Sequence, residues 1–326
     1  MATTNHQIKG FIQSSYDYRV RRNDKNLASL QRQIQILSVV KNLQIFEPTC
    51  METLEFYITL EQLLTDSNEK SQLSWKIITL LSHISQSSSI RASLRDDIQL
   101  VPVLTGYLLN NKLSADKTLK LLQLIQEISY NIKIVRIESW VTDLIPHLVS
   151  TFLGTSASDE LIVPLLSTLA NICRANPPVF NYLRDVGSKK KLMERCINLL
   201  SAGSHIQLLS SEILLYLDMG LEKMDPTHIN SVLDLIFASA KEGVNENNLS
   251  LLCLSKDIFL HLLLCPRLEE RIRSYKQFGD QMKFLINQLE NATSEKIVEV
   301  LLRFLKLSIE MEHPDIKSLY RSMFIK

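Results

Sequence analysis

Glycine is scarce in this chain, and other features that mark common protein classes are weak or missing. Only eight of the 326 residues are glycine, which argues against glycine-rich loops that bind phosphates. Basic and acidic residues nearly cancel, at 36 and 35, and leave a formal net charge of +1. No global field therefore attracts nucleic acid or an anionic membrane, and we predict no direct binding to either.

Cysteine is also sparse and follows no pattern. The five cysteines form no C-x-x-C pair, and an odd number without a framework favours buried thiols in a reducing compartment over disulfides. No apolar run reaches the ~18 residues of a membrane span, since even residues 249–264 are interrupted by charged side chains. The first residues lack the apolar core of a signal peptide. We therefore expect a soluble, cytoplasmic protein.

Motifs for catalysis and metal binding are missing as well. Neither G-x-S-x-G nor H-E-x-x-H occurs, and the seven histidines are scattered. Asp257 and His261 share a helix face at i, i+4, but a metal ion needs three or four ligands, so we interpret the pair as solvated or capping side chains. The two tryptophans, Trp75 and Trp140, are expected in the core rather than at a binding surface. The chain is thus predicted to be no enzyme, with no catalytic residue, cofactor or metal.

The chain does contain a repeat. Residues 100–109 begin Leu-Val-Pro and residues 144–153 begin Leu-Ile-Pro, so that Pro102 and Pro146 lie 44 positions apart. Longer apolar helical stretches start at Leu121 and Leu165 with the same offset. A period of roughly 40–47 residues with two or three helices is typical of HEAT and armadillo solenoids. No alternation typical of strands is long enough to predict β structure, so the predicted fold is all-α.

We predict an armadillo/HEAT-like, right-handed superhelical solenoid of about six three-helix repeats. Residues 1–42 carry two helical patterns joined by a charged turn and are predicted to be a helical N-terminal cap, continuous with the repeats of residues 43–326. Three repeats are expected to place a short helix before the one that begins at a proline, because Leu-Arg-Asp at 94–96 recurs at 183–185. In the first repeat, Ile58 is expected to face inward.

The long last helix of an armadillo-type repeat lines the inner side of the solenoid, so its polar positions are candidates for binding. Stepping by the period from Asn171 leads to Glu127 and His83, and positions one turn earlier extend the strip. The candidate protein-binding residues are His83, Gln123, Glu127, Ser167, Asn171, Glu212 and Tyr216. Such a strip is typical of a groove for an extended peptide, although exposed helix faces are polar in any case.

Two stretches near the middle of the chain resemble a known family. Tyr-Asn-Ile-Lys-Ile at 130–134 is followed one period later by Leu-Ala-Asn-Ile-Cys-Arg at 169–174. Together they resemble the N-terminal armadillo region of the cancerous inhibitor of protein phosphatase 2A family, with weaker similarity at 233–237 and at Met323 and Phe324. The resemblance implies a non-catalytic scaffold that binds regulatory subunits of protein phosphatase 2A and inhibits the phosphatase.

The same resemblance implies a mitotic role in genome stability. Family members tether broken chromosomes through a BRCT-repeat scaffold that binds topoisomerase II, which would require access to chromatin in mitosis. They also form homodimers and carry a long C-terminal coiled coil. This chain ends at Lys326 without sustained heptads, so we expect a fragment or a shortened relative.

The alternative function is a general armadillo adaptor for extended peptides, for example in nuclear transport. Adaptors of the importin-alpha kind need a tryptophan one turn before the groove asparagine in successive repeats. Thr79, Gln123 and Ser167 occupy those positions here, so the sequence favours the phosphatase-regulating scaffold.

Overall fold

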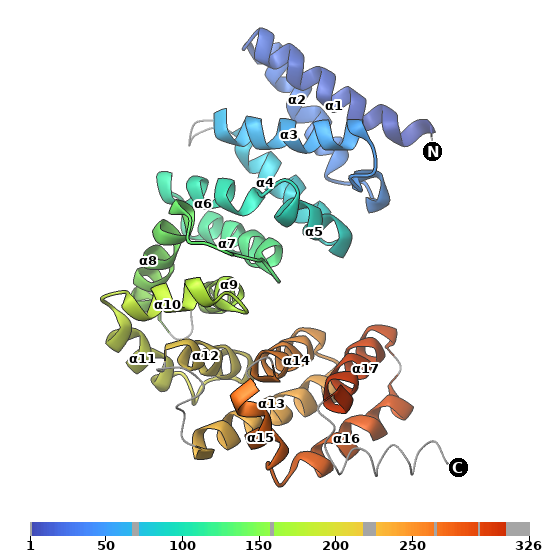
Figure 1. Ribbon diagram of the computed structural model, residues 1–326. Helices are drawn as coiled ribbons and strands as arrows, with labels where there is room; N and C mark the ends of the chain where they lie inside the picture. The colour runs from blue at the N-terminus through green and yellow to red at the C-terminus, as the bar shows by residue number, and fades with distance from the viewer. Residues whose placement is uncertain are drawn as a thin grey trace. The chain divides into compact units, whose positions relative to one another are not determined.

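The computed structural model describes residues 2–66, 72–156, 160–217, 226–263, 266–292 and 294–310. These residues form seventeen α-helices and one short 3-10 helix, and none of them belongs to a β-strand (Figure 1). The prediction of an all-α fold is confirmed for them. Met323 and Phe324, which carry part of the family resemblance, lie outside the described residues.

Among the helices of the described ranges, none combines the length and the apolar character that a bilayer span requires.

The chain divides into two compact units. The first contains the helices up to Phe152 together with Ser167–Ile172, and the second contains Leu153–Leu166 and the chain from Cys173 onwards. Helix α8 (Ser139–Gly154) and helix α9 (Ile162–Cys173) therefore contribute residues to both units.

The helices of the first unit stack in two rows. Besides α8 and α9, they are α1 (Ala2–Val20), α2 (Asp24–Leu37), the 3-10 helix η1 (Leu43–Phe46), α3 (Met51–Asp66), α4 (Gln72–Ile84), α5 (Ser88–Asp96), α6 (Leu100–Asn110) and α7 (Ala115–Ser129). In one row α1 contacts α3 and α3 contacts α6, while in the other α2 contacts α4 and α4 contacts α7. Rows in which each helix touches the next are typical of helical solenoids.

Local sequence signals explain where helix α2 begins and which face it buries. The Asn23 side chain accepts a hydrogen bond from the N–H of Asn26 and so caps the helix. Leu30, Ile34 and Leu37 follow at helical spacing and are fully buried. Residues 1–42 thus contain two helices joined by a short turn, where the sequence predicted two helical patterns.

Helices α7 and α9 end in the same way. Asn131 and Ala175 lie two residues beyond the respective helix ends, 44 positions apart, and adopt left-handed φ angles of 62° and 57°. In both cases the N–H of the next residue donates to the carbonyl of the last helical residue at 3.0 Å. A left-handed residue after a helix supplies donors to the last carbonyls, so the 44-residue period extends to the helix ends.

The second unit contains the remaining helices. They are α10 (Pro177–Asp185), α11 (Lys189–Asn198), α12 (Ser204–Leu217), α13 (Pro226–Asn245), α14 (Leu249–Leu263), α15 (Pro266–Arg273), α16 (Phe278–Asn291) and α17 (Glu295–Glu310). Helix α14 contacts both α12 and α17, and α13 contacts α12, α14 and α16. Gly243 permits a close approach of α13 to α14, because a Cβ there would lie 2.9 Å from the backbone nitrogen of Leu252.

Two expectations for the helices are corrected. Ile58 was expected to face inward, but 46% of it is exposed, while Phe56 and Leu60 are buried. The apolar stripe of α3 runs through these two residues, and Ile58 lies off that stripe. Pro146 was expected at the start of a helix, whereas it lies inside α8, seven residues after Ser139.

The expected short helix before α8 is also absent. Residues 130–138 form an irregular segment between α7 and α8. Asn131 turns the chain into the left-handed region, and the β-branched residues Ile132, Ile134 and Val135 favour extended backbone. The repeat therefore keeps its length while an irregular segment replaces one helix.

Burial of the cysteines matches the expectation in part. Cys173 and Cys196 are buried, as expected of thiols in a helical core, whereas Cys50 is exposed.

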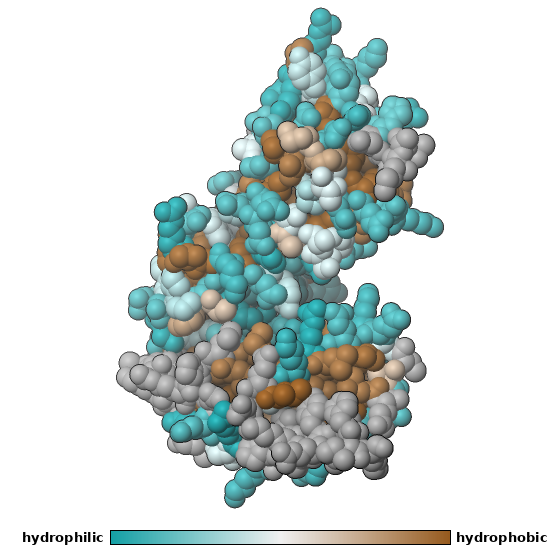
Figure 2. Space-filling view, turned by 45° about the vertical axis from the view of Figure 1, so that its right-hand side comes forward, coloured by the Kyte–Doolittle hydropathy of each residue, from teal (hydrophilic) through white to brown (hydrophobic). Residues whose placement is uncertain are grey.

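Figure 2 shows hydrophilic residues over much of the described surface in that view, with hydrophobic residues visible between them.

Candidate protein-binding site

In the first unit, three of the candidate residues reach the surface. Gln123 and Glu127 on α7 are exposed, and His83 on α4 is half-buried with its Nε2 atom 2.7 Å from the carbonyl oxygen of Val40. Thr79, one turn before His83, is exposed too. Because α4 contacts α7, we call Thr79, His83, Gln123 and Glu127 the α4–α7 face.

Glu127 also bonds to the preceding repeat. Ser85, next to the end of α4, donates its hydroxyl to Glu127 Oε2 at 2.7 Å. This hydrogen bond orients the carboxylate but leaves the residue exposed. Glu127 can therefore serve both a partner and the packing of α4 on α7.

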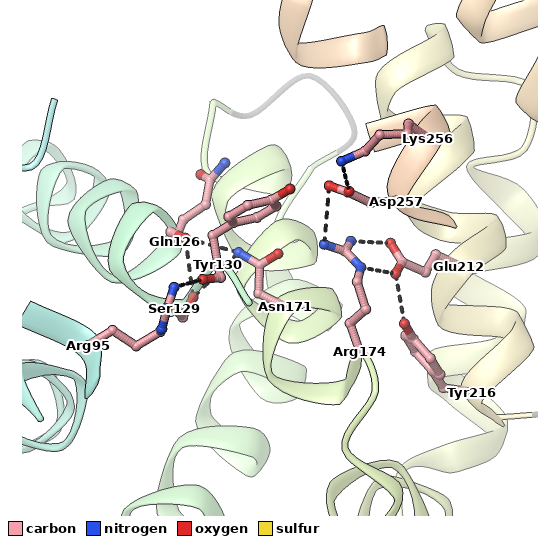
Figure 3. Close-up of polar contacts among 10 residues, drawn as sticks. All are labelled: Arg95, Gln126, Ser129, Tyr130, Asn171, Arg174, Glu212, Tyr216, Lys256 and Asp257. Atoms are coloured by element: carbon pink, nitrogen blue, oxygen red, sulfur yellow. Dashed lines mark hydrogen bonds and ion pairs between the residues drawn. The ribbon is translucent and has the colours of Figure 1, made fainter. Parts of the chain in front are cut away.

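Asn171 and Ser167 are buried, contrary to the expectation that they form part of an exposed strip. Each is only 6% exposed. The Asn171 side chain donates to the carbonyl oxygen of Gln126 at 2.9 Å and lies 3.4 Å from the Ser129 hydroxyl (Figure 3). Gln126 is among the last four residues of α7, whose carbonyls have no partner within the helix, so Asn171 satisfies one of them.

In the second unit, Glu212 and Tyr216 are buried as well, contrary to the same expectation. The Glu212 carboxylate receives two hydrogen bonds from the Arg174 guanidinium, Nε to Oε1 and Nη2 to Oε2, both at 2.8 Å. The Tyr216 hydroxyl donates to Oε1 of the same carboxylate at 2.7 Å (Figure 3). Glu212 is completely buried and Arg174 is 9% exposed.

The cluster continues onto helix α14. Arg174 Nη1 lies 4.0 Å from Asp257 Oδ2, and Lys256 Nζ lies 2.6 Å from Asp257 Oδ1 (Figure 3). Two positive and two negative side chains thus alternate across α12, α14 and the residue after α9. Asp257 and His261 were interpreted as solvated or capping side chains, and the first of these alternatives is wrong, because they are only 5% and 9% exposed.

Burial and charge shift the pKa values of this cluster in opposite directions. Burial by itself raises the pKa of Glu212, but the Arg174 charge and the hydrogen bonds from Arg174 and Tyr216 outweigh it, so the pKa lies below its ordinary value. Burial, reinforced by the Glu212 charge, raises the pKa of Tyr216 well above its usual range. Glu212 is therefore ionised and Tyr216 remains a hydrogen-bond donor at neutral pH.

His261 lies at the edge of this cluster. Its ring makes an edge-on contact with Tyr216, with 5.2 Å between centroids. Its Nδ1 atom has no hydrogen-bond partner among the described residues. Burial lowers the pKa of His261, while the Glu212 charge partly opposes the shift. The neutral imidazole is thus the favoured form.

The charged side chains of this cluster interact with one another. The Arg174–Glu212 pair connects the residue after α9 to α12, and Asp257 extends the contacts to α14. Over the part of the chain that the structure describes, no group of three histidine, cysteine, aspartate or glutamate residues could hold a metal ion. The α4–α7 face is what remains of the predicted strip as a surface open to a partner.

Sequence reasoning missed Arg174 and Lys256. Arg174 ends the stretch Leu-Ala-Asn-Ile-Cys-Arg, and a basic residue immediately after a strongly apolar helix was the available signal. Its partner Glu212 lies 38 positions later, on a helix of the next repeat. No local pattern links the two residues.

A family model described as CIP2A, N-terminal, matches residues 1–312 of the chain. The chain belongs to the CIP2A family. The resemblance inferred from residues 130–134 and 169–174 is thereby confirmed, and membership supports a CIP2A-like regulator or scaffold in general. The second stretch contains Asn171 and Arg174, whose contacts are described above.

Among solved structures, the crystal structure of an engineered protein from the Northeast Structural Genomics Consortium is similar to this CIP2A-family chain. The similarity covers 92% of this chain and 68% of that chain, at 14% sequence identity and a TM-score of 0.48. Similarity at this level carries no conclusion about function.

Proposed function

We propose that this chain is a non-catalytic protein-interaction scaffold that binds regulatory subunits of protein phosphatase 2A and inhibits the phosphatase. The observation that carries the proposal is the match of the CIP2A N-terminal family over residues 1–312. A role in mitotic genome stability, through a BRCT-repeat scaffold that binds topoisomerase II, is part of the same proposal. The corresponding location is the cytoplasm, with access to chromatin in mitosis.

The proposed architecture is an armadillo/HEAT-like, right-handed superhelix of about six three-helix repeats, with residues 1–42 as its cap. The order of helices supports it, because groups of two or three helices end with α4, α7, α9, α12, α14 and α17.

A homodimer, implied by the family, is the proposed assembly. Light scattering at several concentrations tests it, and a mass that stays that of one 37.4 kDa chain contradicts it.

The proposed partner-binding surface is the α4–α7 face. It is supported by the exposure of Gln123 and Glu127 on neighbouring turns of α7, with His83 half-buried on α4. The buried members of the predicted strip are proposed to stabilise the fold instead, because their side chains bond to neighbouring helices. Substituting them would therefore destabilise the chain rather than remove a contact with a partner.

The experiment is affinity purification from dividing cells with the full chain as bait. The test variant is Gln123→Ala/Glu127→Ala, and the matched control is Gln62→Ala/Glu55→Ala, which changes the same residue types at exposed positions of α3. We expect phosphatase regulatory subunits or the BRCT scaffold to be enriched by the unmodified chain and the control, and reduced with the test variant. Circular dichroism establishes that all three baits are folded.

Each outcome bears on a different part of the proposal. Equal enrichment by all three baits supports the function and overturns the α4–α7 face as its site. Absence of both partners from every bait overturns the phosphatase and chromosome-tethering roles. Capture of import receptors instead favours the nuclear-transport adaptor.

A further inference from the structure

A pocket of ≈ 380 Å³ opens in the first unit where the irregular segment 130–138 replaces a helix of the repeat. Its walls come from the end of α5, the first turn of α6, that segment and the start of α8. Pockets of this size hold a small ligand or one or two side chains of a peptide. The pocket is separate from the α4–α7 face, since none of the four residues of that face lines it.

The interior of the pocket is apolar at several points. Ile132 and Ile134 are 7% exposed, and Pro102 and the half-buried Trp140 also line it. Val135 belongs to the same lining and is 91% exposed. An exposed valine and a half-buried tryptophan in one lining are suitable contacts for an apolar side chain of a partner.

Most of the polar side chains in the lining already have partners. Arg95 donates to the carbonyl oxygen of Tyr130 at 2.5 Å and to both carboxylate oxygens of Asp96, at 2.8 Å and 2.6 Å (Figure 3 shows Arg95 with Tyr130). Glu138 accepts a hydrogen bond from the Trp140 indole N–H at 3.2 Å. The side chains of Arg95, Asp96, Glu138 and Trp140 therefore already have hydrogen-bond partners in the chain.

Lys133 and Arg136 are different. Both line the pocket and are exposed, and neither side chain has a hydrogen bond or an ion pair with any residue in the described ranges. They flank the exposed Val135 in sequence. Two unpaired cations on either side of an apolar contact complement a ligand that carries carboxylates next to an apolar side chain.

We propose that this pocket binds a short acidic peptide segment of a partner protein. An apolar side chain of the peptide enters between Trp140 and the isoleucines, and flanking aspartate or glutamate side chains pair with Lys133 and Arg136. RNA is disfavoured because its continuous run of phosphates would also lie near Asp96 and Glu138 in the same lining, whereas a peptide can present carboxylates to Lys133 and Arg136 alone. The inference deepens the proposed scaffold function, on which it rests, by giving the chemistry of one of its ligands.

The test is selection of a random heptapeptide library on the immobilised full chain. We expect enriched peptides to combine aspartate or glutamate with an adjacent large apolar residue. Lys133→Glu/Arg136→Glu should weaken the binding of an enriched peptide by roughly tenfold or more, since it reverses both contacts. The matched control is Lys25→Glu/Lys41→Glu, which makes the same change in net charge at exposed lysines of the same unit.

Fluorescence provides a second readout that locates the peptide. Trp75→Phe leaves Trp140 as the only tryptophan, because the chain contains two. Adding an enriched peptide should then shift the Trp140 emission, and Lys133→Glu/Arg136→Glu in the same background should suppress the shift. A peptide that binds with unchanged emission contradicts the assignment to this pocket.

The proposal is overturned by any of three results. These are a selection without acidic bias, equal weakening by the test and control variants, and equally tight binding of a short oligouridylate at the same salt concentration. The last result would mean a general anion site rather than a peptide pocket. Because the selection uses no cellular partner, it can fail while phosphatase subunits are still captured, and it can succeed when they are not.

Discussion

Arg174 and Glu212 form a buried bidentate ion pair that joins the end of α9 to α12, with both N···O distances 2.8 Å. The carboxylate has no exposed surface, and the Tyr216 hydroxyl occupies a further acceptor site on it. A residue whose polarity suggests a binding surface is here part of the interior. Removing Arg174 would leave the buried Glu212 carboxylate without its counter-charge, so substitution of this pair tests the structure directly.

We predict that Arg174→Met destabilises the chain by about 3–5 kcal/mol, because it leaves the buried Glu212 carboxylate without its counter-charge. Urea unfolding followed by circular dichroism measures the change in the free energy of unfolding. The double variant Arg174→Met/Glu212→Leu should recover part of the loss, since neither charge is then buried. The control, Arg303→Met, breaks an exposed ion pair with Glu299 and should cost less than about 1 kcal/mol. Similar losses from both single variants would mean that the buried pair has no special weight.

Acid should destabilise the second unit through His261. Burial lowers the pKa of His261 in the folded chain, so the unfolded chain binds more protons once the pH falls below the ordinary histidine value of about 6.5. Stability is therefore full above that value and is lost as the pH falls toward the folded pKa. Burial also lowers the pKa of His205 in the second unit and of His147 in the first, and each acts in the same direction on the unit that contains it.

The measurement is the urea midpoint at pH 7.5 and pH 5.5 for the unmodified chain and for His261→Phe, which keeps an aromatic ring against Tyr216. We expect the midpoint to fall at the lower pH in both proteins, and less in the variant. Glu212 contributes separately at lower pH, because its lowered pKa gives stability that is lost as the pH falls through its titration. An equal fall in the two proteins would show that His261 titrates normally.

Two glycines should respond in opposite ways to the same substitution. Gly243→Ala places a Cβ 2.9 Å from the backbone nitrogen of Leu252, so α13 and α14 must move apart and stability should fall by about 1–3 kcal/mol. Gly106 lies in α6, and a Cβ added there would meet no neighbouring atom within 4 Å. Gly106→Ala should therefore stabilise the chain by up to about 1 kcal/mol through helix propensity. Thermal unfolding of the two variants side by side measures both signs. Stabilisation by Gly243→Ala would disprove the close approach of the two helices.

The left-handed residues that follow α7 and α9 allow a second comparison of two substitutions. Ala175 has a φ of 57°, a conformation that costs residues with a Cβ roughly 1–2 kcal/mol. Ala175→Gly should therefore stabilise the chain by up to about 1 kcal/mol after the entropy cost of glycine. Asn131→Gly at the equivalent position should gain less, because asparagine tolerates this region. Chemical unfolding compares them, and a larger gain at Asn131 would contradict the argument.

Sequence alone predicted the all-α fold and most helices, because a 44-residue period repeats the same apolar spacing. Its errors arose where one repeat departs from the others. The repeat that contains Pro146 was expected to have a short helix like its neighbours, but Asn131 and the β-branched residues after it favour extended chain. Averaging over repeats conceals a change that occurs in only one of them.

The candidate strip shows a second limit. Register placed Glu127, Asn171 and Glu212 correctly on the last helices of successive groups, but residue type could not tell which were exposed. Glu127 stays at the surface, Asn171 satisfies a carbonyl of α7, and Glu212 is paired with Arg174. Burial of a polar residue depends on a partner some forty positions away, and a single sequence does not choose that partner.

The hydrogen bonds between consecutive helix groups in the first unit have a consequence for how that unit opens. His83 bonds to Val40, Ser85 to Glu127, and Asn171 to Gln126, so each group is tied by a side chain to the one before it. Opening one group breaks a bond in its neighbour, which raises the cost of fraying and favours loss of the unit as a whole. Amide hydrogen exchange should accordingly show α4 and α7 protected to a common free energy of opening, rather than a gradient from one helix to the next.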